Sequence, residues 1–436
     1  MSWQERYKSK LISADEAAQK VKSGDIILTG LGFAEPSMLI PTAISARRDE
    51  LEKVTVGGAL QIRPYPWYFE DTEDNFIVSP GWASKLLRNH YRERRADFVP
   101  MMASTANPLL LRKFWKVDVG ILMVTAPDKH GWCNLGLTNF YSKEMIANAK
   151  LVIAETNEQM PTVYGDNWVH IDDFDLIVEN SSPIPALPSI DSYSDTEKAI
   201  AEHIAPLIKN RDNLQLGIGG IPSAIINLIK DREDLGIVSE MLPLGLPDLV
   251  EKGVVTNKFK NIHKGVSIAT FCIGDQKMYD FVDHNPGVGL YPSVYTNGVD
   301  FISRHRDLVS INAAIEIDLK GQVTAESIGS RHISGAGGQF DFVMGTFRSE
   351  NGRSIMVLPS TRQTSEGLVS TIVPTLQPGA TVTVQPYYTQ YVCTEHGIVD
   401  LTGQSWRTRA NLLISIAHPD FRVEMVKQMK NIYYSV

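Results

Sequence analysis

Short apolar runs and amphipathic stretches alternate along this chain, and the same order of patterns occurs in both halves. In the first half, Ser13 to Glu16 form a capping-box sequence that predicts a helix start, and an apolar strand pattern follows over residues 25–29. In the second half, Ser194 to Glu197 form another capping box, and Leu214 to Leu216 form the strand pattern. Each strand pattern runs into a glycine-rich turn. This self-similarity indicates two like domains.

A second pair of matching blocks supports the duplication. The apolar run at residues 118–122 leads to Asp128-Lys129-His130-Gly131, and the run at residues 307–311 leads to Asp318-Leu319-Lys320-Gly321. Each block predicts a strand, a turn and a return strand. Because strands alternate with capped helices in each half, we expect an α/β fold. It would consist of two similar open domains with largely parallel sheets, related by internal duplication.

A proline-rich stretch separates the two halves. Residues 181–189 carry three prolines, which favour an extended and fairly stiff linker. A chain of 436 residues is long enough for roughly two to four domains. We therefore expect a first domain over residues 1–188 and a second domain over residues 189–436.

Composition and charge narrow the function classes. Hydrophobic residues make up 43% of the chain and charged residues 21%, which is ordinary for a soluble globular protein. The formal net charge of −8 argues against a nucleic-acid or anionic-membrane partner, because such surfaces need an excess of Lys and Arg. The N-terminus lacks a signal-peptide pattern, and the apolar runs are too short to span a bilayer. We expect a cytoplasmic protein.

Metal and serine-hydrolase chemistry find little support in the sequence. The three cysteines, Cys133, Cys272 and Cys393, are widely spaced and are predicted to be small buried residues in a reducing compartment. His130 and Cys133 form one pair of metal-ligand types, but a second pair at zinc spacing is missing, so we predict no metal site. The chain has neither a G-x-S-x-G nor a Walker A motif.

The glycine turn of the second half is a candidate binding element. Its sequence, Gly217-Ile218-Gly219-Gly220-Ile221-Pro222, begins like a dinucleotide fingerprint, but Pro222 stands where the third glycine belongs. Glu35 stands at that place in the first half, so a nicotinamide cofactor is disfavoured. The turn is either a tight strand-to-helix connection or an anion site made by free N–H groups at a helix start.

Glu240 is the candidate catalytic residue. A single Glu is more often a solvated or helix-capping carboxylate, but Glu240 lies between the apolar segments Leu235 to Val238 and Met241-Leu242. A carboxylate in such surroundings is costly to bury unless it has a task or a partner. Aligning the two halves sets Gly58 opposite Glu240. We therefore expect one site per chain, with the first half as a wall or substrate cradle.

A second glycine-rich segment, Ser334 to Phe342, allows two interpretations. It is either a flexible loop or a place where the backbone approaches a phosphate or thioester oxygen closely, which only glycine permits. The residues of this segment alone leave both open.

These stretches together resemble a known enzyme family. The similarity lies in residues 216–222, 236–241, 334–343, 391–398 and 416–421. It identifies the acetyl-CoA hydrolase/transferase family, the class I CoA-transferases, and extends over essentially the full length. Within that family the chain is most similar to the 4-hydroxybutyrate or butyrate type.

The resemblance implies a ping-pong transfer of CoA between acetyl-CoA or acetate and a short-chain acid. Glu240 would be the nucleophile and a glutamyl-CoA thioester the intermediate. The implied oxyanion and CoA contacts come from two glycine loops and a later serine: Gly217, Ile218, Gly219, Gly220, Ile221, Gly337, Gly338 and Ser360. The implied partners are acyl-CoA, with CoA as a substrate rather than a cofactor, and short-chain carboxylates. Arg331, Arg348 and Arg362 are candidates for the CoA phosphates, and a homodimer is the implied assembly.

Two alternatives remain open at this point. An acyl-CoA hydrolase of the same fold would use the same anhydride and release CoA without an acid acceptor. A non-catalytic acyl-CoA-binding protein would bind the thioester without turnover.

Overall fold

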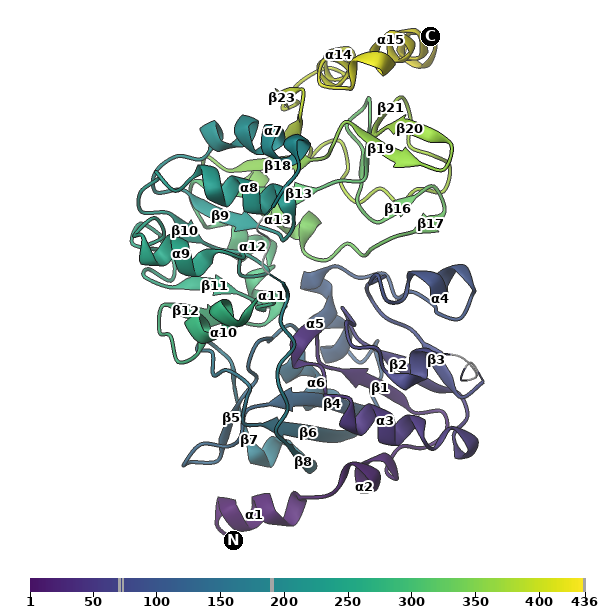
Figure 1. Cartoon of the computed structure of the whole chain (residues 1–436), viewed down its shortest axis with the longest axis vertical. Coiled ribbons are helices and arrows are strands. Elements are labelled where there is room, and N and C mark those ends of the chain that lie inside the picture. Colours follow the sequence, from purple (N-terminus) through teal and green to yellow (C-terminus); the bar gives the residue numbers. More distant parts are fainter. Residues whose placement is uncertain (70–71, 73, 189–191, 434–436) are drawn as a thin grey trace. The chain divides into compact units, whose positions relative to one another are not determined.

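The computed structural model describes residues 1–69, 72, 74–188 and 192–433 (Figure 1). The end of the predicted linker and the start of the predicted second domain, residues 189–191, lie outside the described residues. The chain forms two compact units: Met1–Leu187 with Ile268–Thr296 is unit 1, and Pro188–Ser267 with Asn297–Val436 is unit 2. One segment of the second half therefore belongs to unit 1, whereas the sequence suggested a single cut.

Unit 1 contains a parallel sheet with the strand order β3-β2-β1-β4-β6-β8. Its strands are β1 (Ile26–Thr29), β2 (Val54–Gly57), β3 (Phe76–Val78), β4 (Val119–Val124), β6 (Leu151–Asn157) and β8 (Leu176–Asn180). A separate antiparallel pair joins β5 (Trp132–Asn134) and β7 (Trp168–His170). The fully buried strand β4 is typical of a sheet covered on both faces.

Helices of unit 1 connect and cover these strands. They are α1 (Trp3–Lys10), α2 (Ala14–Ala18), α3 (Leu39–Ser45), α4 (Arg88–Arg92), α5 (Ala103–Leu111) and α6 (Ser142–Asn148). The returning segment contributes α10 (Gln276–Val282), β12 (Val288–Leu290), α11 (Ser293–Thr296) and most of β11 (Ser267–Ala269). Short 3₁₀ helices lie at Gly32–Ala34, Arg48–Glu50, Pro66–Tyr68 and Ile171–Asp173. The capping box predicted at Ser13 is confirmed, because its Oγ accepts from the Glu16 N–H at 3.1 Å.

Unit 2 contains a second sheet with the order β10-β9-β13-β18-β22-β23. The first five of these strands are parallel, and β23 runs antiparallel to β22. The strands are β9 (Asn213–Leu216), β10 (Gly236–Ile237), β13 (Leu308–Ala313), β18 (Arg353–Val357), β22 (Tyr391–Thr394) and β23 (Gly397–Asp400). Both sheets confirm the predicted α/β class with largely parallel strands.

The helices of unit 2 include two pairs that pack together, α7 with α8 and α12 with α13. They are α7 (Asp195–Ile204), α8 (Gly220–Leu228), α9 (Leu246–Glu251), α12 (Val299–Ser303), α13 (Gln339–Arg348), α14 (Trp406–Ser415) and α15 (Pro419–Tyr433), with a 3₁₀ helix at Ala205–Leu207. Smaller ladders form from β14 (Glu316–Asp318), β15 (Val323–Thr324), β16 (Ser327–Ile328), β17 (Arg331–His332), β19 (Thr361–Thr364), β20 (Gly367–Ser370) and β21 (Ile372–Val373).

The inner strands of the two sheets share the order expected of a duplication, but their register corrects one detail. Ile26 in unit 1 and Asn213 in unit 2 each lie four residues before the first glycine of their turn, so these two positions are equivalent. Ile26 pairs with Thr55 on the neighbouring parallel strand, and Asn213 pairs with Gly236. This register sets Ala59 opposite Glu240, one residue beyond the Gly58 that the sequence alignment suggested. The glycine turns fix which residues of the two units are equivalent. An alignment of the short apolar runs alone is offset by one residue. Neither Gly58 nor Ala59 carries a carboxylate, so unit 1 has no counterpart of Glu240 at this position.

Candidate active site

Glu240 and the glycine turn meet at the carboxyl edge of the second sheet. The turn follows β9 directly, and Glu240 follows β10, its neighbour in the sheet. Val238 continues the pairing, since its N–H donates to the Leu214 carbonyl at 3.0 Å. The Ser239 hydroxyl donates to the Leu216 carbonyl at 3.3 Å. The carboxyl ends of parallel strands are where open α/β sheets bind ligands.

The Glu240 carboxylate contacts the second glycine loop. The Gly338 N–H donates to its Oε2 at 2.8 Å, and Gly338 is the N-cap of the ten-residue helix α13. A helix N-terminus offers free N–H groups and a positive dipole end to an anion. A Cβ on Gly338 would overlap both this oxygen and the Asn297 amide nitrogen. Glycine at this position is therefore required by the close approach of the carboxylate.

Burial raises the pKa of the Glu240 carboxyl group to about 7. Charge repulsion from the nearby Asp341 carboxylate, 1% exposed in the first turn of α13, is the second contribution to this raised pKa. Hydrogen bonds from the Gly338 N–H and the Asn297 side chain act in the opposite direction. Near neutral pH, Glu240 is thus divided between its protonated and ionised forms, a property common among catalytic carboxylates.

The glycine turn divides into an open part and a packed part. Apart from its chain neighbours, no atom of the described residues lies within 4 Å of a Cβ built on Gly217, and the Ile218 side chain is 48% exposed. Gly219 is the N-cap of α8 with φ +126°, a conformation that L side chains rarely adopt. A Cβ on Gly220 would collide with the Glu197 carboxylate, and Ile221 is buried. A Cβ on Gly219 also meets no described atom within 4 Å beyond its chain neighbours, so Gly217, Ile218 and Gly219 form the open part of the turn, where a ligand has room.

Ser360 lies on the same sheet edge but away from Glu240. It follows β18, and three strand spacings of about 4.8 Å separate β18 from β10, or about 14 Å. Its N–H donates to Glu395 Oε2 at 2.9 Å, and its hydroxyl donates to Oε1 of the same carboxylate. The serine is fully buried, so its polar atoms are engaged within the protein.

The three arginines differ in their surroundings. Arg362 forms an ion pair with the buried Glu316 carboxylate, with Nη2 and Oε1 2.7 Å apart. Its charge is therefore largely balanced inside the protein. Arg331 and Arg348 are exposed and remain accessible to an anion.

Asn297, Asp341 and Glu395 were not singled out from the sequence. Asn297 begins an Asn-Gly pair, and Asp341 is the third residue of the helix that follows the second glycine loop. An acidic residue in a first helical turn is also common for simple dipole stabilisation. Only its burial beside Glu240 distinguishes Asp341 from that ordinary role.

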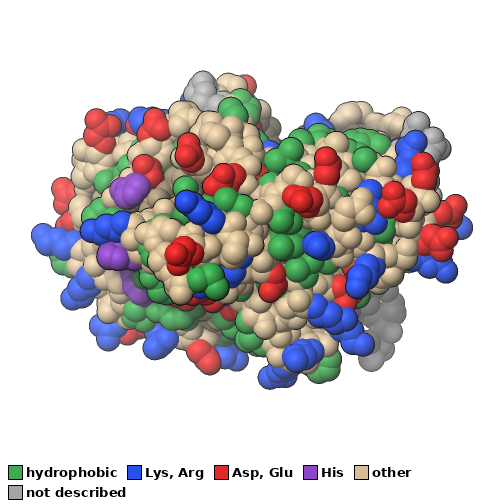
Figure 2. All heavy atoms as spheres, turned by 90° about the horizontal axis from the view of Figure 1, so that it is seen from below, with side chains coloured by type: hydrophobic (Ala, Val, Ile, Leu, Met, Phe, Trp, Pro, Cys, Tyr) green, Lys and Arg blue, Asp and Glu red, His purple; other side chains and the backbone are tan. Residues whose placement is uncertain are grey.

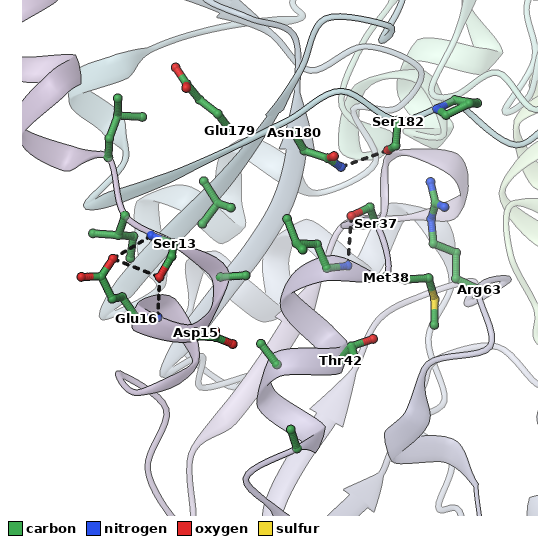
Figure 3. A pocket seen from close by; sticks show the side chains of 18 residues that line it. Ser13, Asp15, Glu16, Ser37, Met38, Thr42, Arg63, Glu179, Asn180 and Ser182 are labelled. Carbon is green, nitrogen blue, oxygen red and sulfur yellow. Dashed lines mark hydrogen bonds between the residues drawn. The ribbon is translucent and has the colours of Figure 1, made fainter.

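A separate pocket of about 1130 Å³ lies in unit 1. It is bordered by α2, α3 and the end of β8, and Figure 3 shows the Asn180–Ser182 hydrogen bond on one side of it with Arg63 nearby. None of the predicted site residues lines it. The pocket therefore does not belong to the edge that carries Glu240.

Over the described ranges, no helix is both long and apolar enough to cross a bilayer. Within the same part of the chain, no group of three or more His, Cys, Asp or Glu side chains is arranged to hold a metal ion. The three cysteines are buried, as predicted. Figure 2 shows acidic and basic side chains interspersed on the face it presents.

Comparison with protein families identifies the chain. Residues 1–188 match the acetyl-CoA hydrolase/transferase N-terminal domain, and residues 274–429 match the acetyl-CoA hydrolase/transferase C-terminal domain. The chain belongs to the acetyl-CoA hydrolase/transferase family. The earlier resemblance is thereby confirmed.

Individual relatives extend this assignment over the whole length. The chain is 38% identical to 4-hydroxybutyrate coenzyme A transferase of Clostridium kluyveri, covering 99% of both chains. It is 37% identical to butyryl-CoA:acetate CoA-transferase of Anaerostipes caccae, covering 98% of this chain and 97% of the relative. The crystal structure of RipA from Yersinia pestis superposes with a TM-score of 0.90 at 32% identity, covering 99% of this chain and all of that one. The protein is accordingly an enzyme of the CoA-transferase type.

Proposed function

We propose that the protein transfers CoA between acetyl-CoA or acetate and a short-chain acid of the 4-hydroxybutyrate or butyrate type. The acid substrates are taken from the full-length relatives, which act on such acids by name. The catalytic proposal rests on one observation, the partly buried Glu240 carboxylate held against the Gly338 N–H at the start of α13.

The reaction proceeds in two covalent stages. Glu240 attacks the thioester carbonyl carbon of the acyl-CoA, the C–S bond breaks, and an acyl-glutamyl anhydride and CoA thiolate form. The thiolate then attacks the glutamyl carbonyl carbon, the acid leaves as its carboxylate, and a glutamyl-CoA thioester remains. The second carboxylate runs both stages in reverse. Protons are neither consumed nor released, so a general acid is not needed.

The ionisation of Glu240 supports its role as nucleophile. Only the carboxylate form attacks, and a pKa of about 7 keeps a large share of it ionised at neutral pH. A more basic carboxylate is also a stronger nucleophile than one with the ordinary pKa near 4.5, because reactivity follows basicity. Carboxylates remain weak nucleophiles, so binding of the distant part of CoA must lower the barrier further.

The contact with Gly338 supports stabilisation of the second stage. When the thiolate attacks the glutamyl carbon, negative charge develops on a glutamyl oxygen. The Gly338 N–H already lies 2.8 Å from Oε2, which is the distance expected of an oxyanion donor. Asn297, whose side chain also hydrogen-bonds this carboxylate, would assist.

Two open positions are assigned to the thioester and the body of CoA. Gly217, whose Cβ position is open, and the exposed Ile218 directly follow β9, the strand next to the one that precedes Glu240. Ser360 and Glu395 lie further along the same edge, where they would shape the wall for the distant part of CoA. Arg331 and Arg348 are the exposed cations that remain for its phosphates.

Mass spectrometry after exposure to acyl-CoA tests the proposal directly. Incubation with butyryl-CoA should add CoA to the peptide that carries Glu240, and borohydride should reduce this thioester. Adding acetate should then release acetyl-CoA. The Glu240→Gln variant, which keeps the size of the side chain, should form no adduct.

Other outcomes separate the alternatives. Free CoA released without an acid acceptor, at the rate of the acetate-dependent reaction, would make the protein a hydrolase. Acyl-CoA binding with neither adduct nor turnover would make it a binding protein. The proposed assembly is a cytoplasmic homodimer, and light scattering should give twice the 48.5 kDa mass of the chain.

A further inference from the structure

Within the described structure, Glu240 follows a strand whose outer edge has no neighbouring strand. In the order β10-β9-β13-β18-β22-β23, β10 is outermost, and among the described residues only a single bridge, Leu235↔Val255, lies beside it. The N–H groups of Gly236 and Val238 point inward to β9. The N–H and C=O of Ile237 therefore point outward, where an edge strand exposes unpaired groups.

Two side chains from one loop take up both outward groups. The Ile237 N–H donates to Asn257 Oδ1 at 2.9 Å, and the Lys260 Nζ donates to the Ile237 carbonyl at 2.8 Å. The loop itself is braced, because Asn257 Nδ2 donates to the Ser267 hydroxyl at 2.9 Å and Lys260 Nζ donates to the Val266 carbonyl at 2.6 Å. We call Asn257 and Lys260 the edge clamp.

Lys260 is an unusual residue for a merely structural position. It is 1% exposed, and its stem packs on Gly236 so closely that a Cβ there would come 2.8 Å from Lys260 Cγ. It has no carboxylate partner in the described part of the chain, and burial alone lowers its pKa to about 7. Such a group is costly to bury unless its hydrogen bonds have a use.

The clamp is insensitive to the titration of its lysine. A neutral amine retains two N–H bonds, which match the two carbonyl oxygens that Lys260 contacts. The titratable groups that face it are His263 on the same loop and His305 after α12. Burial lowers the pKa of both histidines, and the positive charge of Lys260 lowers it further. The two contacts therefore persist on either side of pH 7.

We propose that the edge clamp is a positioning device for Glu240, which stands three residues beyond the residue that Asn257 and Lys260 hold. It rests on the proposed role of Glu240 as nucleophile. The clamp holds Ile237 from outside while the hydrogen bonds of Gly236 and Val238 hold the same strand from inside, and together they keep the carboxylate against Gly338. Misplacing a reacting group by about 1 Å costs about 10²-fold in rate.

Single-turnover kinetics on the full chain tests the clamp. Lys260→Met keeps the stem and removes both donors, so glutamyl-CoA formation should slow by about 10²-fold while the KM for butyryl-CoA changes by less than threefold. Lys258→Met is the matched control, because Lys258 is exposed on the same loop. It should keep the rate of the natural protein.

A second pair of variants covers the case in which Lys260→Met does not fold. Asn257 has φ +55°, so Asn257→Gly removes the side chain without straining the backbone, and Asn257→Asp keeps the acceptor for the Ile237 N–H. The glycine variant should lose about tenfold in rate with KM retained, and the aspartate variant should restore most of it. Folded variants that form the thioester at the natural rate would overturn the proposal, as would a loss confined to KM. Absence of any thioester in the natural protein would instead refute the role of Glu240.

Discussion

The two units share the order of their inner strands but differ at the strand that precedes the active carboxylate. In unit 1, β2 is paired on its outer side by β3 through Val54↔Phe76, Thr55↔Ile77 and Val56↔Val78. In unit 2, the equivalent strand β10 is outermost, and side chains of Asn257 and Lys260 take the place of a backbone neighbour. The two halves thus keep the same inner strands but differ in what lies on the outer side of the strand equivalent to β2. In unit 2 this outer strand, β10, is the one that Glu240 follows.

Each unit also holds a buried carboxylate near the end of its first strands, in different surroundings. Glu35 is fully buried and accepts from the Ile62 and Arg63 N–H groups at 3.3 and 3.2 Å. Burial raises its pKa to about 8. Glu240 keeps part of its surface accessible and faces a helix N-terminus. Access to solvent, rather than a raised pKa, separates the candidate nucleophile from a structural carboxyl group.

Removing each carboxylate in turn should give the largest difference. Glu240→Gln should lower CoA transfer by about 10⁴-fold or more, because the covalent intermediate cannot form. Glu35→Gln should stay within about tenfold of the natural rate, because Glu35 is mostly protonated at pH 7 and glutamine has nearly its shape. Steady-state transfer from butyryl-CoA to acetate measures both. Equal losses in the two variants would erase the distinction between the units.

The glycine at the carboxylate should matter more than the glycine in open space. Gly338→Ala places a methyl group against Glu240 Oε2 and should lower the rate of glutamyl-CoA formation by about 10²–10³-fold. The added methyl group of Gly217→Ala has no described atom within 4 Å other than those of its chain neighbours, so this variant should fold with unchanged thermal stability. Any loss in Gly217→Ala should then appear as a raised KM for acyl-CoA. A fully active Gly338→Ala enzyme would remove the oxyanion role assigned to this N–H.

Asp341 should set the pH dependence of the nucleophile. In the natural protein, the rate of glutamyl-CoA formation should rise with pH as Glu240 ionises, with a midpoint near pH 7. The charge of Asp341 raises the pKa of Glu240, so Asp341→Asn should move this midpoint to lower pH and make the variant faster below it. Single-turnover rates across pH 5 to 9 measure the shift. A midpoint that stays in place would show that the two carboxylates are uncoupled.

The smallest effect should be on the pH dependence of stability. The pKa of Glu35 rises from 4.5 to about 8 on folding, so the folded state binds more protons between these values. Its stabilising share is complete below about pH 4.5 and is lost as pH rises toward 8. Glu35→Gln should therefore flatten the fall of the unfolding free energy over that range in urea titrations. Lys260 should change the unfolding free energy with pH in the opposite direction. Its pKa falls from 10.5 to about 7 on folding, so the unfolded state binds more protons between these values and stability rises with pH. Lys260→Met should remove this rise above pH 7.

Local patterns predicted much of the architecture because their causes are local. The capping box at Ser194 forms as expected, with its Oγ accepting from the Glu197 N–H at 3.2 Å. The apolar runs that begin near residues 118 and 307 are the buried strands β4 and β13. The assignment of the segment Ile268–Thr296 to unit 1 was missed, because no local pattern records which core a segment joins.

The sequence by itself determined the α/β class, the duplication and the motif that carries Glu240, since turn chemistry and hydrophobic period act over a few neighbouring residues. The tertiary structure alone decided what surrounds that carboxylate. Gly338, which donates to the carboxylate, is 98 residues away in sequence, and Asp341 belongs to the same distant segment. Lys260 comes from a third segment and holds Ile237, three residues before Glu240. Parallel strands bring the ends of distant segments together at one edge of the sheet, and burial at that edge sets the pKa of Glu240. A local sequence pattern predicts neither effect, because both depend on residues far apart in the chain.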